Sequence, residues 1–103
     1  MLVEGLGEVK VRVAFIHLIA KEVGVREEEV EVEGGASLKD LLDLLVRRHG
    51  EAFKKYVYDS DKGEVRGYAI VTVNGNVVQR SRVGDVKLNE GDRVFFGIGA
   101  GGG

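Results

Sequence analysis

Hydrophobic and polar residues alternate in two segments near the start of the chain. Valines at every second position predict a strand over residues 9–16 with one buried face. Residues 29–33 alternate in the same way and stop at a glycine pair that begins with Gly34. Between them lies a short apolar segment, 18–23, and because Gly24 follows it we expect one or two helical turns. The two strands should pair as a hairpin-like unit.

The pattern changes to a helical period over residues 37–49. Ser37 is suited to accept a hydrogen bond from a first-turn amide, and Asp40 completes a capping-box-like pair three positions later. Gly50 then supplies a left-handed exit. The apolar residues recur at i, i+3, i+4, i+7 and i+8, so they share one face that should pack on a sheet: Leu38, Leu41, Leu42, Leu45 and Val46.

The second half of the chain predicts one connection and several further strands. Aromatic residues followed by a turn-rich stretch make 51–67 a packed connection with an exposed tip. Residues 69–73 form a strand, and Asn74-Gly75 favours a tight two-residue hairpin turn into Val77-Val78. The turn residues 89–92 feed a last strand from Arg93 to Ile98.

This order of elements predicts an α+β fold. One main helix packs across one face of a mixed sheet, and a β-grasp is the natural architecture. A chain of 103 residues is long enough for one core and too short for two. We therefore assign residues 1–96 to a β-grasp domain with a short N-terminal lead, and residues 97–103 to a flexible glycine-rich tail.

Composition and charge narrow the classes of function. With 44% hydrophobic and 31% charged residues the chain is globular in type. Its net charge of -2 comes from basic and acidic residues spread along the sequence, so no basic surface for nucleic acid is expected. The start lacks a signal peptide, and no segment approaches the roughly 20 apolar residues of a membrane span. We expect a cytoplasmic protein without nucleic-acid or membrane partners.

Residues suited to catalysis or metal binding are sparse. The chain has no cysteine, so any sulfur chemistry must be supplied by another molecule. Residues 59–64 resemble part of a calcium loop, but the flanking helices and the distant bidentate glutamate are not evident, which favours a solvated turn. His17 and His49 have no partner at ligand spacing and are interpreted as surface or helix-end residues. No metal site is predicted, and the chain looks like a substrate.

The C-terminal segment is the first candidate for function. Its last residues have almost no side chains, so they could enter a narrow site on another protein and present the carboxylate of Gly103 there. Directly before it, Phe95 and Phe96 should face opposite sides of a regular strand. One of them should be core and the other a hydrophobic docking point. The alternative is a flexible tail without function.

Two other patterns are weaker. Gly97, Gly99 and Gly102 satisfy G-x-G-x-x-G, but the dinucleotide motif needs a following helix, which is absent here. The basic cluster 47–49 at the end of the main helix either complements the helix dipole or contacts a partner.

The order of elements and several short stretches resemble the MoaD/ThiS family of ubiquitin-like sulfur carriers, most closely its molybdopterin synthase small-subunit branch. Each stretch alone is weakly specific, whereas their order before a Gly-Gly end is much more so. The resemblance covers roughly residues 9–103 and is carried by 9–15, the helix from Ser37, 73–75, 89–96 and Gly102-Gly103.

This resemblance implies a function and partners. An E1-like adenylyltransferase of the MoeB/ThiF type would use ATP to adenylate Gly103, and a sulfur donor would convert it to a thiocarboxylate for molybdopterin synthesis. A MoaE-like large subunit would be the second partner. The chain itself would bind no cofactor and act as a carrier, alone or as the small subunit of molybdopterin synthase. Besides Gly102, the residues implied to contact partners are Phe95, Phe96, Ile98, Gly99, Ala100 and Gly101.

Two alternatives stay open beside the sulfur carrier. Related archaeal proteins become joined to lysines, so the chain could be a ubiquitin-like modifier, and a noncatalytic β-grasp binding module is the third reading. The sequence also departs from the family pattern in two places. Many molybdopterin-type carriers have a proline pair where this chain has Gly97-Ile98-Gly99, and three final glycines leave open whether Gly102 or Gly103 ends the active form.

Overall fold

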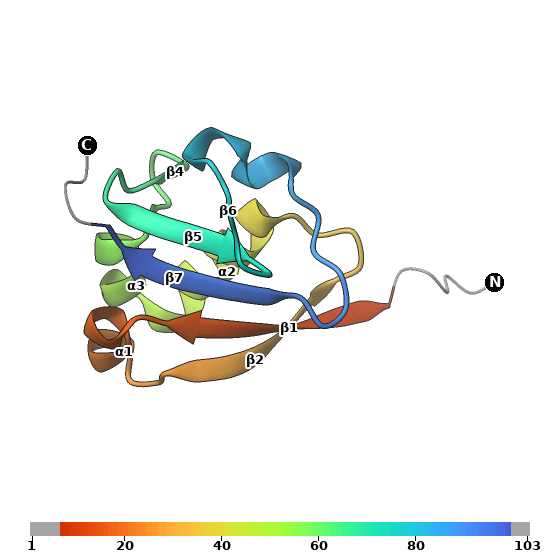
Figure 1. Ribbon diagram of the computed structural model, residues 1–103, viewed down its shortest axis with the longest axis horizontal. Coiled ribbons are helices and arrows are strands. Elements are labelled where there is room, and N and C mark those ends of the chain that lie inside the picture. Colours follow the sequence, from red (N-terminus) through yellow and green to blue (C-terminus); the bar gives the residue numbers. More distant parts are fainter. Residues whose placement is uncertain (1–6, 100–103) are drawn as a thin grey trace.

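A computed structural model describes residues 7–99, and Figure 1 shows the arrangement of its elements. Its main sheet has five strands in the order β2-β1-β7-β5-β6. The central pair, β1 and β7, is parallel, and the remaining neighbours are antiparallel. This is the predicted mixed sheet. The strands span Glu8–Phe15 (β1), Glu27–Glu33 (β2), Ala69–Val73 (β5), Asn76–Val77 (β6) and Arg93–Ile98 (β7).

The β1–β2 pair forms as the alternating pattern predicts. Val11 pairs with Val30 on the buried face, and the charged residues between the valines point to the other face. Helix α1 (His17–Val23) connects the two strands and ends at Gly24, whose φ of 94° is the left-handed conformation that glycine adopts without steric cost.

Helix α2 (Leu38–His49) lies across the buried face of the sheet, as predicted. The Ser37 hydroxyl accepts a hydrogen bond from the Asp40 amide at 3.1 Å, and the Asp40 carboxylate accepts one from the Ser37 amide at 2.9 Å. This confirms the capping box, which satisfies two amides that the helix leaves without partners. The four leucines of the predicted apolar face are fully buried: Leu38, Leu41, Leu42 and Leu45.

The connection predicted over residues 51–67 contains regular structure that the sequence pattern did not reveal. Helix α3 (Glu51–Tyr56) follows α2 directly, and a two-stranded sheet of β3 (Tyr58–Asp59) and β4 (Glu64–Val65) follows α3. The left-handed exit at Gly50 is corrected as well. Its φ of 68° is positive but its ψ is -141°, a kink that ends one helix and starts the next.

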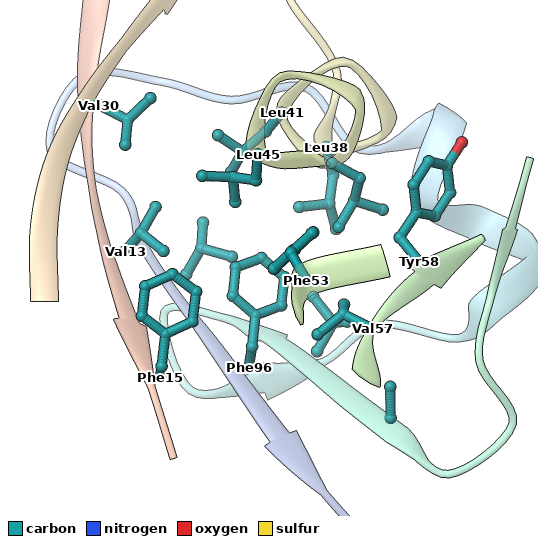
Figure 2. Packing of buried hydrophobic residues seen from close by; sticks show 14 of the residues in the cluster. Val13, Phe15, Val30, Leu38, Leu41, Leu45, Phe53, Val57, Tyr58 and Phe96 are labelled. Atoms are coloured by element: carbon teal, nitrogen blue, oxygen red, sulfur yellow. The ribbon is translucent and has the colours of Figure 1, made fainter. Parts of the chain in front are cut away.

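The hydrophobic core lies between the sheet and the three helices, and aromatic rings fill its centre (Figure 2). Phe96 on β7 packs edge to face on Phe53 of α3, with ring centroids 5.1 Å apart, and lies nearly parallel to Phe15 of β1 at 5.8 Å. These contacts explain why α3 forms: Phe53 is completely buried. In residues 7–99 no buried side-chain nitrogen or oxygen lacks a hydrogen-bond partner.

The turn between β5 and β6 has the conformation predicted from its residues. Asn74 and Gly75 have φ values of 53° and 86°, which is the two-residue hairpin turn expected between β5 and β6. The Asn74 carboxamide also accepts a hydrogen bond from the Arg93 amide, which ties this hairpin to the start of β7. Between β6 and β7 lies a 3₁₀ helix, η2 (Arg80–Asp85). None of the helices within the described residues has the length and hydrophobicity needed to cross a membrane.

Candidate functional site

The last strand separates its two phenylalanines as predicted. Phe96 faces the core and is completely buried, whereas Phe95 faces the opposite side of the sheet and is 39% exposed. Phe96 is therefore a core residue and is removed from the candidate partner contacts. Ile98 lies on the same face as Phe96 and packs, partly buried, against the core. Its side chain therefore contributes to the fold and is not part of the exposed apolar surface.

Phe95 belongs to an apolar surface on the face of the sheet that α2 leaves uncovered. Ile70 of β5 and Val77 of β6 are exposed on this face, at 37% and 71%. Thr72 links them, because it pairs with Val77 on one side and with Phe95 on the other. We call Ile70, Val77 and Phe95 the outer patch. Sequence analysis named Phe95 and Phe96 without deciding which of them is exposed, and it did not find Ile70, although the alternation of β5 marks Ile70 as outward-facing.

Glycines let two members of the outer patch lie flat on β7. A Cβ atom at Gly97 would approach the Phe95 ring to 3.0 Å, and one at Gly99 would approach Ile70 Cδ1 to 2.9 Å. The ring and the isoleucine thus occupy the space that side chains at positions 97 and 99 would fill. The role of these glycines is close packing, and the dinucleotide motif has no support here.

A groove adjoins the outer patch on the side of β6 and η2. Ile70 and Val77 line it together with the cationic residues Lys39 and Arg80. The Lys39 ammonium donates a hydrogen bond to the Tyr58 hydroxyl at 3.0 Å, and this bond raises the pKa of Lys39 above its ordinary value. Glu64 lines the same groove, so a surface that docks on the outer patch would meet both positive and negative charge at this border.

Residues 97–99, which sequence analysis assigned to the tail, belong to the folded part of the chain. Gly97 and Ile98 belong to β7, and the Gly99 amide donates a hydrogen bond to the Tyr68 carbonyl at 2.8 Å, which extends the contact with the segment before β5. Ala100, Gly101, Gly102 and Gly103 lie outside the described residues.

The β1–β2 half of the same sheet face is charged. Lys10 pairs with Glu31 and Arg12 with Glu29 across the two strands, and the Arg12 guanidinium lies 3.5 Å from the Glu27 carboxylate. Opposite charges that face each other across strands satisfy one another. Near the end of this half a hydrogen bond with Glu31 raises the pKa of Glu8, because it favours the protonated form.

The basic cluster at the end of α2 is tied into the fold. His49 and Arg48 both contact the Glu28 carboxylate on β2, at 2.6 Å and 3.4 Å. The His49 side chain is only 10% exposed and packs edge to face on Phe15. It is the last residue of α2, so the prediction of a surface or helix-end residue is confirmed for the helix end. His17, the first residue of α1, is exposed.

The calcium-like stretch is a turn held by its own side chains. The Asp59 carboxylate accepts hydrogen bonds from the amides of Asp61 and Lys62 and lies 3.5 Å from the Arg66 guanidinium. Removal from water works against its charge, but the Lys62 and Asp61 amides and Arg66 outweigh this and lower the pKa of Asp59. In the described part of the chain no three His, Asp or Glu residues gather as a metal site.

The geometry thus offers an exposed apolar surface beside the last strand. Comparison with known proteins gives the family. The ThiS family model matches residues 13–102. The chain belongs to the ThiS family. A search of curated protein sequences finds no match.

Solved structures agree with membership of the ThiS family. SAMP1 from Haloferax volcanii is 28% identical over 91% of this chain and 99% of that chain, with a TM-score of 0.74. A putative molybdopterin converting factor, subunit 1, from Pyrococcus furiosus is 32% identical over 89% and 99%, with a TM-score of 0.67. A chain of the Amycolatopsis orientalis BexX/CysO complex shares the fold at 22% identity over 90% and 99%, with a TM-score of 0.66.

These likenesses confirm the β-grasp, ubiquitin-like fold. They also place this ThiS-family chain among ubiquitin-like sulfur carriers and modifiers, proteins that work with E1-like and other partner enzymes. The match reaches residue 102 and thus includes the glycine-rich segment that sequence analysis singled out, except for its last residue, Gly103.

Proposed function

We propose that the chain is a sulfur carrier for molybdopterin synthesis and that its last glycine is the group that carries the sulfur. The observation that carries this proposal is the 32% identity with the molybdopterin converting factor subunit from Pyrococcus furiosus, which extends over 99% of that chain. The glycine-rich end of the sequence and the outer patch beside the strand that leads to it support the same reading.

The chemistry requires activation by another protein. A C-terminal carboxylate has a pKa near ~3.5 and is ionised and unreactive at neutral pH. An oxygen of the Gly103 carboxylate attacks the α-phosphorus of ATP, the bond to the leaving phosphates breaks, and pyrophosphate departs. A sulfide-level sulfur nucleophile from a donor then attacks the acyl carbon, the C–O bond to AMP breaks, and a thiocarboxylate remains.

The folded body must supply binding energy for this reaction. Fixing four residues beyond Gly99 in an extended form costs roughly 4–8 kcal/mol before they make any contact. Burial of the outer patch against an E1-like adenylyltransferase of the MoeB/ThiF type offsets that cost. A MoaE-like large subunit, the second proposed partner, would receive the same end of the chain.

Intact-mass measurement tests the proposal. After incubation with the adenylyltransferase, ATP and a sulfur donor, the mass should increase by the difference between sulfur and oxygen, and fragmentation should place the change on the last glycine. A variant without Gly103 and one without Gly102 and Gly103 show which glycine ends the active form. An unchanged mass with enzymes that activate a known carrier would refute the proposal.

A second function has its own support. SAMP1, the small archaeal modifier protein 1 of Haloferax volcanii, matches this chain at 28% identity, and a modifier would use the same activated carbonyl. In that case a lysine amine attacks the acyl carbon and an isopeptide bond replaces the bond to AMP. Remnants of the chain's end on lysines of cellular proteins would establish this function, and their absence with the chain well expressed would argue against it.

A further inference from the structure

Two side chains fasten the turn before β5 to helix α3. The last carbonyls of an α-helix have no partner within the helix. In α3 the Lys54 carbonyl accepts a hydrogen bond from Arg66 Nε at 3.0 Å, and the Lys55 carbonyl accepts one from the Tyr68 hydroxyl at 2.7 Å. The Arg66 charge also complements the negative end of the helix dipole. The turn, closed by the hydrogen bond from the Ala69 amide to the Arg66 carbonyl, is therefore fixed at two points.

The same turn holds the last described residue of the chain. The Tyr68 carbonyl accepts the hydrogen bond from the Gly99 amide, one step beyond the Ala69–Ile98 pair that ends the β5–β7 ladder. Ile70 covers Gly99 from the outer face, because its Cδ1 lies 2.9 Å from the position that a Cβ atom at Gly99 would take. The hydrogen bond to the Tyr68 carbonyl thus holds Gly99 within the sheet, and the Ile70 side chain packs against its outer face.

We propose that Tyr68, supported by Arg66, is a positioning residue that fixes where the reactive end of the chain leaves the folded body. This inference rests on the proposed function, because it concerns the presentation of the same C-terminal glycine. Tyr68 connects Gly99 to α3 through its carbonyl on one side and its hydroxyl on the other. We call Arg66, Tyr68 and the carbonyls of Lys54 and Lys55 that their side chains contact the exit clamp.

The clamp works by preventing the end of β7 from fraying. A terminal pair of a ladder opens more easily than the centre, since it has neighbours on one side only. When the Tyr68 turn is fixed to α3, the carbonyl that holds Gly99 does not move away. Because Gly99 is fixed, the C-terminal glycine can take fewer positions relative to an activating enzyme that is docked on the outer patch.

The variant Tyr68→Phe removes the hydroxyl and keeps the ring, so it breaks only the bond to α3. Tyr56→Phe is the matched control, because within residues 7–99 the hydroxyls of Tyr58 and Tyr68 form hydrogen bonds and that of Tyr56 does not. In the full chain, Tyr68→Phe should speed hydrogen exchange at the Gly99 amide by roughly 2- to 10-fold, the range that one hydrogen bond allows. Exchange in the middle of β7 should not change. Unaltered exchange at Gly99 would overturn the clamp.

Kinetics separate positioning from docking. With the adenylyltransferase, Tyr68→Phe should lower kcat for pyrophosphate release by roughly 2- to 10-fold and leave KM unchanged, because the outer patch is intact. Arg66→Met, which removes the second bond, should act in the same direction, and Tyr56→Phe should match the wild type. Faster Gly99 exchange with an unchanged kcat would overturn the positioning role alone. If the wild type is not adenylated, the proposed function fails, and exchange at Gly99 still decides whether the clamp exists.

Discussion

The two faces of β7 differ although they are built from neighbouring residues. On the inner face Phe96 is enclosed by Phe15 and Phe53, and the helices cover the whole surface around it. On the outer face Phe95 has small or polar neighbours, Ala14 and Thr72, and is open to solvent. The inner face is covered by this chain, whereas the described residues leave the outer face open to a partner. Stability should therefore reside in Phe96 and recognition in Phe95.

The largest expected effect is on the inner face. Phe96→Ala should lower the free energy of unfolding by about 3–5 kcal/mol, because it leaves a cavity at the centre of the aromatic cluster. The total free energy of unfolding of a typical domain is about 5–15 kcal/mol, so this is a large fraction of it. Urea titration followed by circular dichroism measures the change. A loss below about 1 kcal/mol would mean that the core collapses around the site and would remove the contrast between the two faces.

The next effect concerns recognition. Phe95→Ala should weaken binding to the activating enzyme by about 2 kcal/mol, close to 30-fold, as for an interface hot spot. Leu18→Ala is the matched control, since Leu18 on α1 is exposed to a similar extent, 46% against 39%, but lies outside the outer patch. Calorimetric titration measures both. Equal binding losses for the two variants would show that general hydrophobicity, and not the outer patch, drives docking.

A smaller effect should follow from the packing of Phe95 on Gly97. In Gly97→Ala the new methyl group pushes the ring off the strand, because its Cβ would approach the ring to 3.0 Å. Binding should weaken by roughly 3- to 10-fold, less than in Phe95→Ala. The double variant Phe95→Ala, Gly97→Ala should bind like Phe95→Ala alone. Additive losses in this cycle would show that Gly97 acts independently of the ring.

The smallest effect belongs to the charged half of the outer face. Arg12→Ala removes the ion pair with Glu27, in which both side chains are about half exposed. The free energy of unfolding should change by less than about 1 kcal/mol, because solvent screens such pairs. Enzyme binding should match the wild type. A binding loss as large as that of Phe95→Ala would extend the docking surface across the whole sheet.

Local patterns in the sequence predicted most of the fold. Alternation over residues 9–16 and 29–33, the Ser37 capping box and the Asn74-Gly75 turn each depend on a few neighbouring residues, and all appear in the structure. Helix α3 was missed because it is only six residues long and follows a glycine that provides no side-chain cap. The spacing of Phe53, Tyr56 and Val57 was its one signal, and the turn residues that follow masked it.

The candidate site was harder to predict, because it is assembled from distant segments. The opposite orientation of Phe95 and Phe96 follows from their own strand. The outer patch also includes Ile70 and Val77, which lie near Phe95 only because β5 and β6 follow β7 in the sheet. Tyr68 gave no signal at all. Its two hydrogen bonds go to a carbonyl of the missed helix α3 and to Gly99, so no local pattern contains them.

The central place of β7 also has a consequence for biosynthesis. The first strand, β1, pairs on one edge with β2, which is close in sequence. Its other edge pairs with β7 at the far end of the chain, for example Arg12 with Arg93. A nascent chain therefore cannot close its sheet until residue 98 has left the ribosome, since such long-range pairing comes late in folding. A chain that ended before Arg93 would leave one edge of β1 and one edge of β5 without a partner strand. Completion of the sheet thus depends on the strand that directly precedes the glycine-rich end of the sequence.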